Sequence, residues 1–68
     1  MEFTIETESE DDGRWIAEVP TLSGVMADGA TRDEARFRVH ALALRVVAER
    51  LEHGEGGSEF LTIVFRAA

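Results

Sequence analysis

The 68-residue sequence contains no cysteine, lysine or tyrosine and only one proline, and each absence excludes something. Without cysteine the chain forms neither a disulfide nor a thiolate metal site, and it has no cysteine nucleophile. No apolar run approaches the roughly 18 residues that a membrane-spanning helix needs. The N-terminal segment 1–13 is acidic where a signal peptide is basic. We therefore expect a cytoplasmic protein with no membrane association and a single domain over residues 1–68.

Positive charge is also scarce. The chain has 14 acidic residues against seven basic ones, all arginine, and a formal net charge of −7. This excess opposes binding to a phosphate backbone, so we expect no direct nucleic-acid binding, and it favours a partner with a basic surface. A chain of this size buries only about 60% of its unfolded surface. Self-association into a dimer or tetramer is the remaining common way to stabilise it.

Alternating hydrophobicity predicts an antiparallel hairpin at the N-terminus. Residues 2–8 and 14–19 alternate apolar and polar side chains with the period of two that a strand with one buried face shows. Asp12-Gly13 between them supplies the positive φ of a tight turn. The buried faces are expected to carry Phe3, Ile5 and Thr7 in the first strand and Trp15, Ala17 and Val19 in the second.

The middle of the chain predicts a loop, a short strand and a helix. Pro20 and Gly24 mark an irregular loop, and residues 25–28 fit a third strand. Thr31 is an N-cap, with Glu34 at the third helical position of a capping box. The helix is expected from Arg32 to about His53.

The C-terminal part predicts one more strand. Gly54 ends the helix in the left-handed region, and residues 59–66, "EFLTIVFR", are apolar at nearly every position. That composition favours a strand covered on both faces. The predicted fold class is α+β, with the order βββαβ and an antiparallel sheet packed on one helix.

The predicted helix carries two apolar stripes when residues are placed at about 100° intervals. One stripe comprises Ala35, Val39, Leu42 and Val46, and the nearly opposite stripe comprises Phe37, Ala41, Leu44, Ala48 and Leu51. A lone helix on one sheet needs only one stripe. Either loops and strand ends cover the second stripe, or it forms an oligomer interface, which we favour.

No pattern in the chain predicts catalysis. His40 and His53 lie on distant turns of the predicted helix, and the acidic run 8–12 lacks the alternation of a calcium loop. We expect no enzyme, no metal and no cofactor. Trp15 is expected in the core. Partner contacts are expected at the acidic hairpin tip and on the polar face of the strands, from Glu10, Asp11, Asp12, Ile16 and Met26.

Residues 12–35, "DGRWIAEVPTLSGVMADGATRDEA", resemble the HicB-type antitoxin family. That family shows aspartate-glycine before an aromatic strand residue, then a proline, two spaced glycines, a threonine cap and a glutamate-alanine pair. The matching positions are Asp12, Gly13, Trp15, Pro20, Gly24, Gly29, Thr31, Glu34 and Ala35. The chain departs from the pattern at Ser23, where a second proline is usual, and at Val25, where a small residue is common.

The resemblance implies a fold similar to a reduced ribonuclease H and a domain that binds and neutralises a small basic mRNA-cleaving toxin of the HicA type. Many family members continue into a DNA-binding segment, and this chain is expected to be a short form without one. Two alternatives remain open. The same fold could serve as a stand-alone homo-oligomeric binding module, or as a nuclease, which needs a metal-binding acidic cluster.

Overall fold

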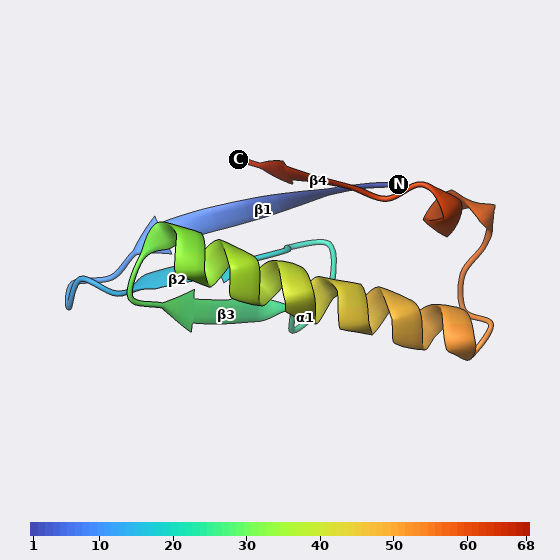
Figure 1. The fold of residues 1–68 in the computed structure, drawn as a ribbon, viewed down its shortest axis with the longest axis horizontal. Coiled ribbons are helices and arrows are strands. Elements are labelled where there is room, and N and C mark those ends of the chain that lie inside the picture. Colours follow the sequence, from blue (N-terminus) through green and yellow to red (C-terminus); the bar gives the residue numbers. More distant parts are fainter.

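One helix covers one face of a four-stranded sheet in the computed structural model, which describes residues 1–68 (Figure 1). The elements are β1 (Glu2–Ser9), β2 (Trp15–Glu18), β3 (Met26–Gly29), α1 (Arg32–Glu52), a 3₁₀ turn η1 (Ser58–Leu61) and β4 (Val64–Ala67). The predicted α+β class and βββαβ order are confirmed. The helix is too polar to cross a membrane.

The sheet is mixed, with the strand order β3-β2-β1-β4. The expected antiparallel pairing holds for β1 with β2 and for β2 with β3, but β4 runs parallel to β1. An entirely antiparallel sheet was therefore the wrong expectation. The reason is the connection between β3 and β4. Because α1 carries the chain back along the sheet, β4 starts from the same end of the sheet as β3 and runs in the same direction. That direction is also the direction of β1.

The C-terminal strand is shorter and less buried than its composition predicts. Of the predicted residues 59–66, the first few form η1, and only Val64–Ala67 pair with β1, at the edge of the sheet. Phe60 is buried, whereas Leu61 is 87% exposed. The expectation of a strand covered on both faces is wrong, because the apolar run serves two elements: η1, which anchors Phe60 in the core, and an edge strand.

The alternating faces of β1 and β2 are confirmed. Phe3, Ile5, Ala17 and Val19 are buried, and Thr7 and Trp15 are half-buried on the same side. The Arg32 guanidinium lies 4.6 Å from the centre of the Trp15 ring. The remaining buried apolar residues are Leu22, Val25, Ala35, Val39, Ala43, Val47 and Phe60.

The buried stripe of α1 differs in part from the predicted one. Ala43 and Val47 are buried, whereas Leu42 and Val46 are only half-buried. The buried residues follow the i, i+4 spacing from Ala35 onward, which is one of the ridges by which a helix packs on its neighbour. The apolar pattern of the sequence could not show whether the row through Leu42 and Val46 or the row through Ala43 and Val47 faces the sheet.

The predicted turn and cap residues take the roles expected of them. Gly13, Gly24 and Gly54 adopt positive φ. The Thr31 hydroxyl accepts a hydrogen bond of 3.1 Å from the Glu34 amide, which confirms the N-cap. These residues fix the hairpin, the loop before β3 and both ends of α1.

Candidate protein-binding surfaces

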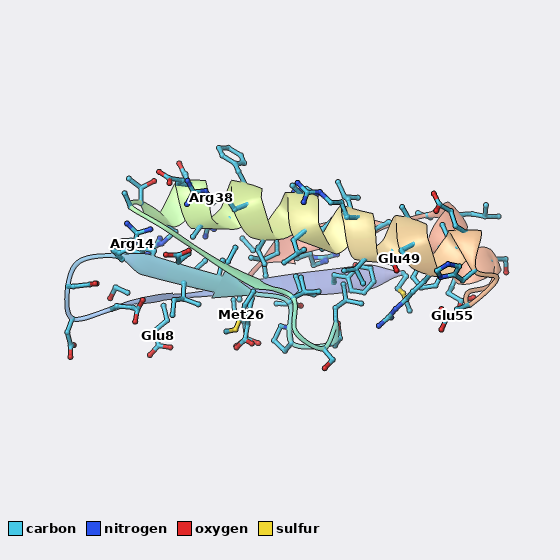
Figure 2. All side chains as sticks on the ribbon, turned by 90° about the horizontal axis from the view of Figure 1, so that it is seen from below. Glu8, Arg14, Met26, Arg38, Glu49 and Glu55 are labelled. Carbon is cyan, nitrogen blue, oxygen red and sulfur yellow. The ribbon has the colours of Figure 1, made fainter.

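The face of the sheet opposite α1 carries no covering element. Figure 2 shows Glu8 and Met26 projecting from the side of the strands that faces away from the helix. The register places Glu6 opposite Glu18 and Glu8 opposite Ile16 on β1 and β2, and Glu18 opposite Met26 on β2 and β3. We call the surface formed by Glu6, Glu8, Ile16, Glu18 and Met26 the open sheet face.

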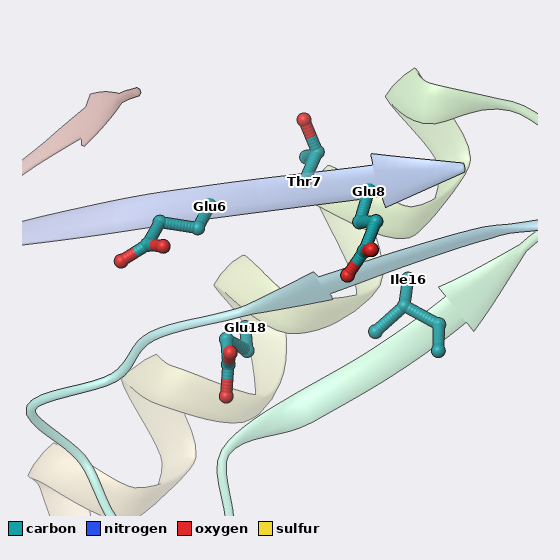
Figure 3. Close-up of a pocket in the computed structure, with 5 residues that line it drawn as sticks. All are labelled: Glu6, Thr7, Glu8, Ile16 and Glu18. Carbon is teal, nitrogen blue, oxygen red and sulfur yellow. The ribbon is translucent and has the colours of Figure 1, made fainter. Parts of the chain in front are cut away.

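A hollow of about 200 Å³ lies on the open sheet face. It is lined by Glu6, Thr7, Glu8, Ile16 and Glu18 (Figure 3). None of the three glutamates belongs to an ion pair in the chain. Like charges directly opposite each other on neighbouring strands destabilise a sheet, and Glu6 and Glu18 are such a pair. The hollow would therefore be stabilised by a cation from another molecule.

Other strand carboxylates, by contrast, are already neutralised within the chain. Arg66 donates to Glu2 at 2.8 Å, and Arg14 donates to Asp28 at 2.9 Å. The hydrogen bond from Arg14, helped by its charge, holds the pKa of Asp28 below its ordinary value. The same pairing raises the pKa of Arg14. The free negative charge of the strands is thus concentrated around Ile16.

The structure separates the predicted partner-binding residues into two groups. Ile16 is half-buried and Met26 is exposed, and both lie on the open sheet face. The acidic tip Glu10–Asp12 lies in the turn beyond Ser9 and Trp15, the last paired residues of the hairpin. Part of the tip stabilises the turn, because Asp12 accepts a hydrogen bond of 3.0 Å from the Arg14 amide.

The glutamates of the hollow are the residues that sequence reasoning missed. Strand alternation alone places Glu6, Glu8 and Glu18 on the polar faces of their strands. Their convergence depends on the register between β1 and β2, which the length of the connecting turn sets.

The second candidate surface is the outer face of α1. We call Phe37, Ala41, Leu44, Ala48 and Leu51 the outer helix stripe. Phe37 is 73% exposed and Leu44 and Leu51 are each 46% exposed, while both alanines are also exposed. Loops and strand ends therefore do not cover the stripe in the single chain. An exposed apolar row of this length is typical of a protein interface.

Neither histidine lies in a group of side chains that could hold a metal ion. His40 is half-buried, and its ring packs on Phe65 of β4 with the ring centres 4.3 Å apart. No group of three or more histidine, cysteine, aspartate or glutamate side chains is arranged to hold a metal ion. What the two surfaces offer is charge and apolar area for binding another molecule.

No protein-family model matches this chain, and no curated protein or solved structure is significantly similar to it. The resemblance to HicB-type antitoxins rests only on the matching residues of segment 12–35, and the function that it implies is therefore a proposal.

Proposed function

We propose that this chain is a HicB-like antitoxin domain that binds and neutralises a small basic mRNA-cleaving toxin of the HicA type. The observation that carries the proposal is the group of three unpaired carboxylates, Glu6, Glu8 and Glu18, around Ile16 on the open sheet face. The open sheet face is the proposed toxin-binding surface.

The distribution of charge directs a basic partner to the sheet. Five of the seven arginines and four of the 14 acidic residues lie in α1, so the helix carries a net charge of +1 and the rest of the chain −8. A basic protein is attracted to the strands and the hairpin and is not attracted to the helix.

The open sheet face combines the two kinds of contact that a protein interface needs. A lysine or arginine of the toxin placed between Glu6 and Glu18 would relieve the repulsion between their carboxylates. Ile16 and Met26 supply apolar contact next to these charges. A surface that binds RNA phosphates is itself basic. An acidic face that covers it would therefore exclude RNA and neutralise the toxin.

The experiment is coexpression of the tagged chain with its neighbouring gene, followed by light scattering of the eluted complex and titration calorimetry. A stoichiometric complex with a small basic protein, whose ribonuclease activity the chain inhibits, is the expected result. The variant Glu6→Gln/Glu18→Gln should weaken the complex by about tenfold or more, because charge pairs across an interface contribute about 1.5 kcal/mol or more each.

The matched control removes the same number of charges from the hairpin tip, as Glu10→Gln/Asp11→Asn. This variant should change the dissociation constant much less. If the tip variant weakens the complex more than the hollow variant does, the open sheet face is not the binding surface. If no complex forms and ribonuclease activity is unaffected, the antitoxin proposal is wrong.

The outer helix stripe favours a second candidate function, a stand-alone homo-oligomeric binding module of the same fold. Such a module needs an interface between copies but no basic partner. A chain that elutes as an oligomer without any coexpressed protein would support this candidate.

A further inference from the structure

We propose that β4 pairs antiparallel with β4 of a second copy of this chain, which joins the two four-stranded sheets into one continuous sheet. The contact is made at the edge of the sheet and does not use the outer helix stripe. The two-fold axis is perpendicular to the joined sheet, so both helices lie on one face and both open sheet faces on the other. This inference does not depend on the proposed toxin.

The outer edge of β4 carries unpaired backbone groups. β4 is the last strand in the order β3-β2-β1-β4, and Figure 1 shows no element beyond it. Toward β1, the amides of Val64 and Ala68 each donate a hydrogen bond of 2.9 Å. Because successive residues of a strand direct their N–H and C=O groups to alternate sides, those of Phe65 and Ala67 point away from β1. An extended backbone is the structure that pairs with such a row of donors and acceptors.

The opposite edge of the sheet, β3, is closed to the same kind of pairing. Arg38 of α1 donates a hydrogen bond of 3.0 Å to the Asp28 carbonyl oxygen. The same guanidinium pairs with Glu34 at 2.7 Å, which holds it beside the strand. Charged side chains at an edge are one means by which proteins prevent strand addition. With one open edge per chain, pairing between copies ends at a dimer and does not continue into a fibre.

The charge of β4 permits two copies to meet there. Each copy has a net charge of −7, so contact between acidic strands would be repulsive. β1, β2 and β3 each contain at least one acidic residue, whereas β4 contains none. Its one charged residue, Arg66, is neutralised by Glu2 of its own chain at 2.8 Å. The edge that is open is therefore also the one without excess negative charge.

The sequence of segment 63–67 identifies the occupant, because it is complementary to itself in the antiparallel direction. With Phe65 opposite Phe65 of the second copy, Val64 lies opposite Arg66. In the same register, Ile63 lies opposite Ala67. Apolar side chains then meet apolar ones on the helix side, and no like charges face each other. A pair centred on Arg66 would instead set arginine against arginine.

The pairing also covers a ring that the single chain leaves half-buried. Phe65 stacks on Phe3 with the ring centres 5.4 Å apart, and the His40 ring lies 4.3 Å from it on the helix side. The outer side of Phe65 would face Phe65 of the second copy. Cross-strand aromatic pairs of this kind stabilise a sheet.

The first test combines sedimentation of the purified chain over a range of concentrations with amide hydrogen exchange. The wild-type chain should dimerise, and exchange at the Phe65 and Ala67 amides should slow as the dimer forms. The Val64 amide, already bonded toward β1, should exchange slowly in monomer and dimer alike. A chain that stays monomeric at every concentration overturns the proposal. So does a dimer in which the Phe65 amide exchanges as fast as in the monomer.

The second test is Ala67→Pro, which removes an outward N–H and no hydrogen bond to β1. The variant should keep the circular dichroism of the wild type. Its dimer should be weaker by about tenfold or more, because one hydrogen bond is lost from each copy.

The third test uses charge, so that the conclusion does not depend on proline. Val64→Arg sets an arginine opposite Arg66 of the second copy and should weaken the dimer several-fold, while Glu2 beside it on β1 preserves the fold. The matched control is Met26→Arg on the closed edge, since Val64 is 40% exposed and Met26 51%. This control should leave the dimer intact.

A last variant separates this contact from the outer helix stripe. Leu44→Glu should leave the β4 dimer intact. A dimer that Leu44→Glu abolishes, while Ala67→Pro and Val64→Arg do not weaken it, would show contact through the helix and overturn the proposal. None of these measurements involves a toxin, so their failure leaves the toxin-binding proposal untouched.

Discussion

Gly29 is the last residue of β3 and lies close to the first turn of α1, and its replacement by alanine should destabilise the fold through contact with backbone. A Cβ at this position would lie 2.7 Å from the Ala35 nitrogen and 3.0 Å from the Glu34 Cβ. Neither atom belongs to the free end of a flexible side chain. To accept the methyl group, the first turn of α1 must move away from β3 and loosen the packing around Ala35, which is fully buried.

We expect Gly29→Ala to lower the free energy of unfolding by about 2 kcal/mol, within the usual range for overpacking a closely packed site. In a domain of this size that loss corresponds to a fall of roughly 8–16 °C in the melting temperature. Gly24 provides the contrast, because its φ is +78° and nothing lies within 4 Å of a Cβ added there. Gly24→Ala should cost roughly 1 kcal/mol, through its backbone conformation alone.

Asparagine distinguishes the two causes. It visits the left-handed region more readily than alanine, so Gly24→Asn should be more stable than Gly24→Ala. At Gly29 the order should reverse, since asparagine is larger and the obstacle there is steric. Urea denaturation followed by circular dichroism, at one protein concentration for all variants, measures both orders. A Gly29→Ala chain as stable as the wild type, or a Gly29→Asn chain more stable than Gly29→Ala, would refute the reasoning.

Two further predictions concern the hydrogen bond that caps α1 at Thr31 and the ion pair, with its two hydrogen bonds, between Arg14 and Asp28. Thr31→Ala removes the acceptor for the Glu34 amide and should cost about 1 kcal/mol of stability, whereas Thr31→Ser should cost much less; chemical denaturation compares the two. Arg14→Gln should let the pKa of Asp28 rise toward its ordinary value, as NMR titration of the carboxyl carbon would show. Because the folded-state pKa of Asp28 is lowered, the stability that the pair contributes is present above the ordinary pKa of aspartate and is lost as pH falls through the lowered pKa. The difference in stability between wild type and Arg14→Gln should therefore be present at neutral pH and vanish in acid; a difference that persists there would show another cause.

Local features of the fold could be predicted because each depends on a few neighbouring residues. The cap at Thr31 needs only a hydroxyl and the amide three residues on. The turn at Gly13 needs only a residue that tolerates positive φ. Strand alternation likewise reports which side of β1 and β2 is buried.

The features that could not be predicted depend on how distant segments meet. The direction and edge position of β4 follow from the crossover through α1, which the composition of residues 59–66 does not record. The choice of Ala43 and Val47 over Leu42 and Val46 depends on the angle at which the helix meets the sheet. The hollow depends on the register that sets Glu6 opposite Glu18. In each case the sequence is compatible with more than one arrangement, and the position of a neighbouring helix or strand decides between them.

The position of β1 between β2 and β4 has a consequence for how the chain acquires its structure. One edge of β1 pairs within a local hairpin, but its other edge pairs with the last residues of the chain, Phe3 lying beside Phe65. Contacts of such long sequence separation form late, because a large loop must close first. On a ribosome β1 is made before β4 and waits for it, with an unpaired edge that the β1 of another copy could occupy. Once the short strand β4 pairs with this edge, the β1 strand of another copy can no longer pair there.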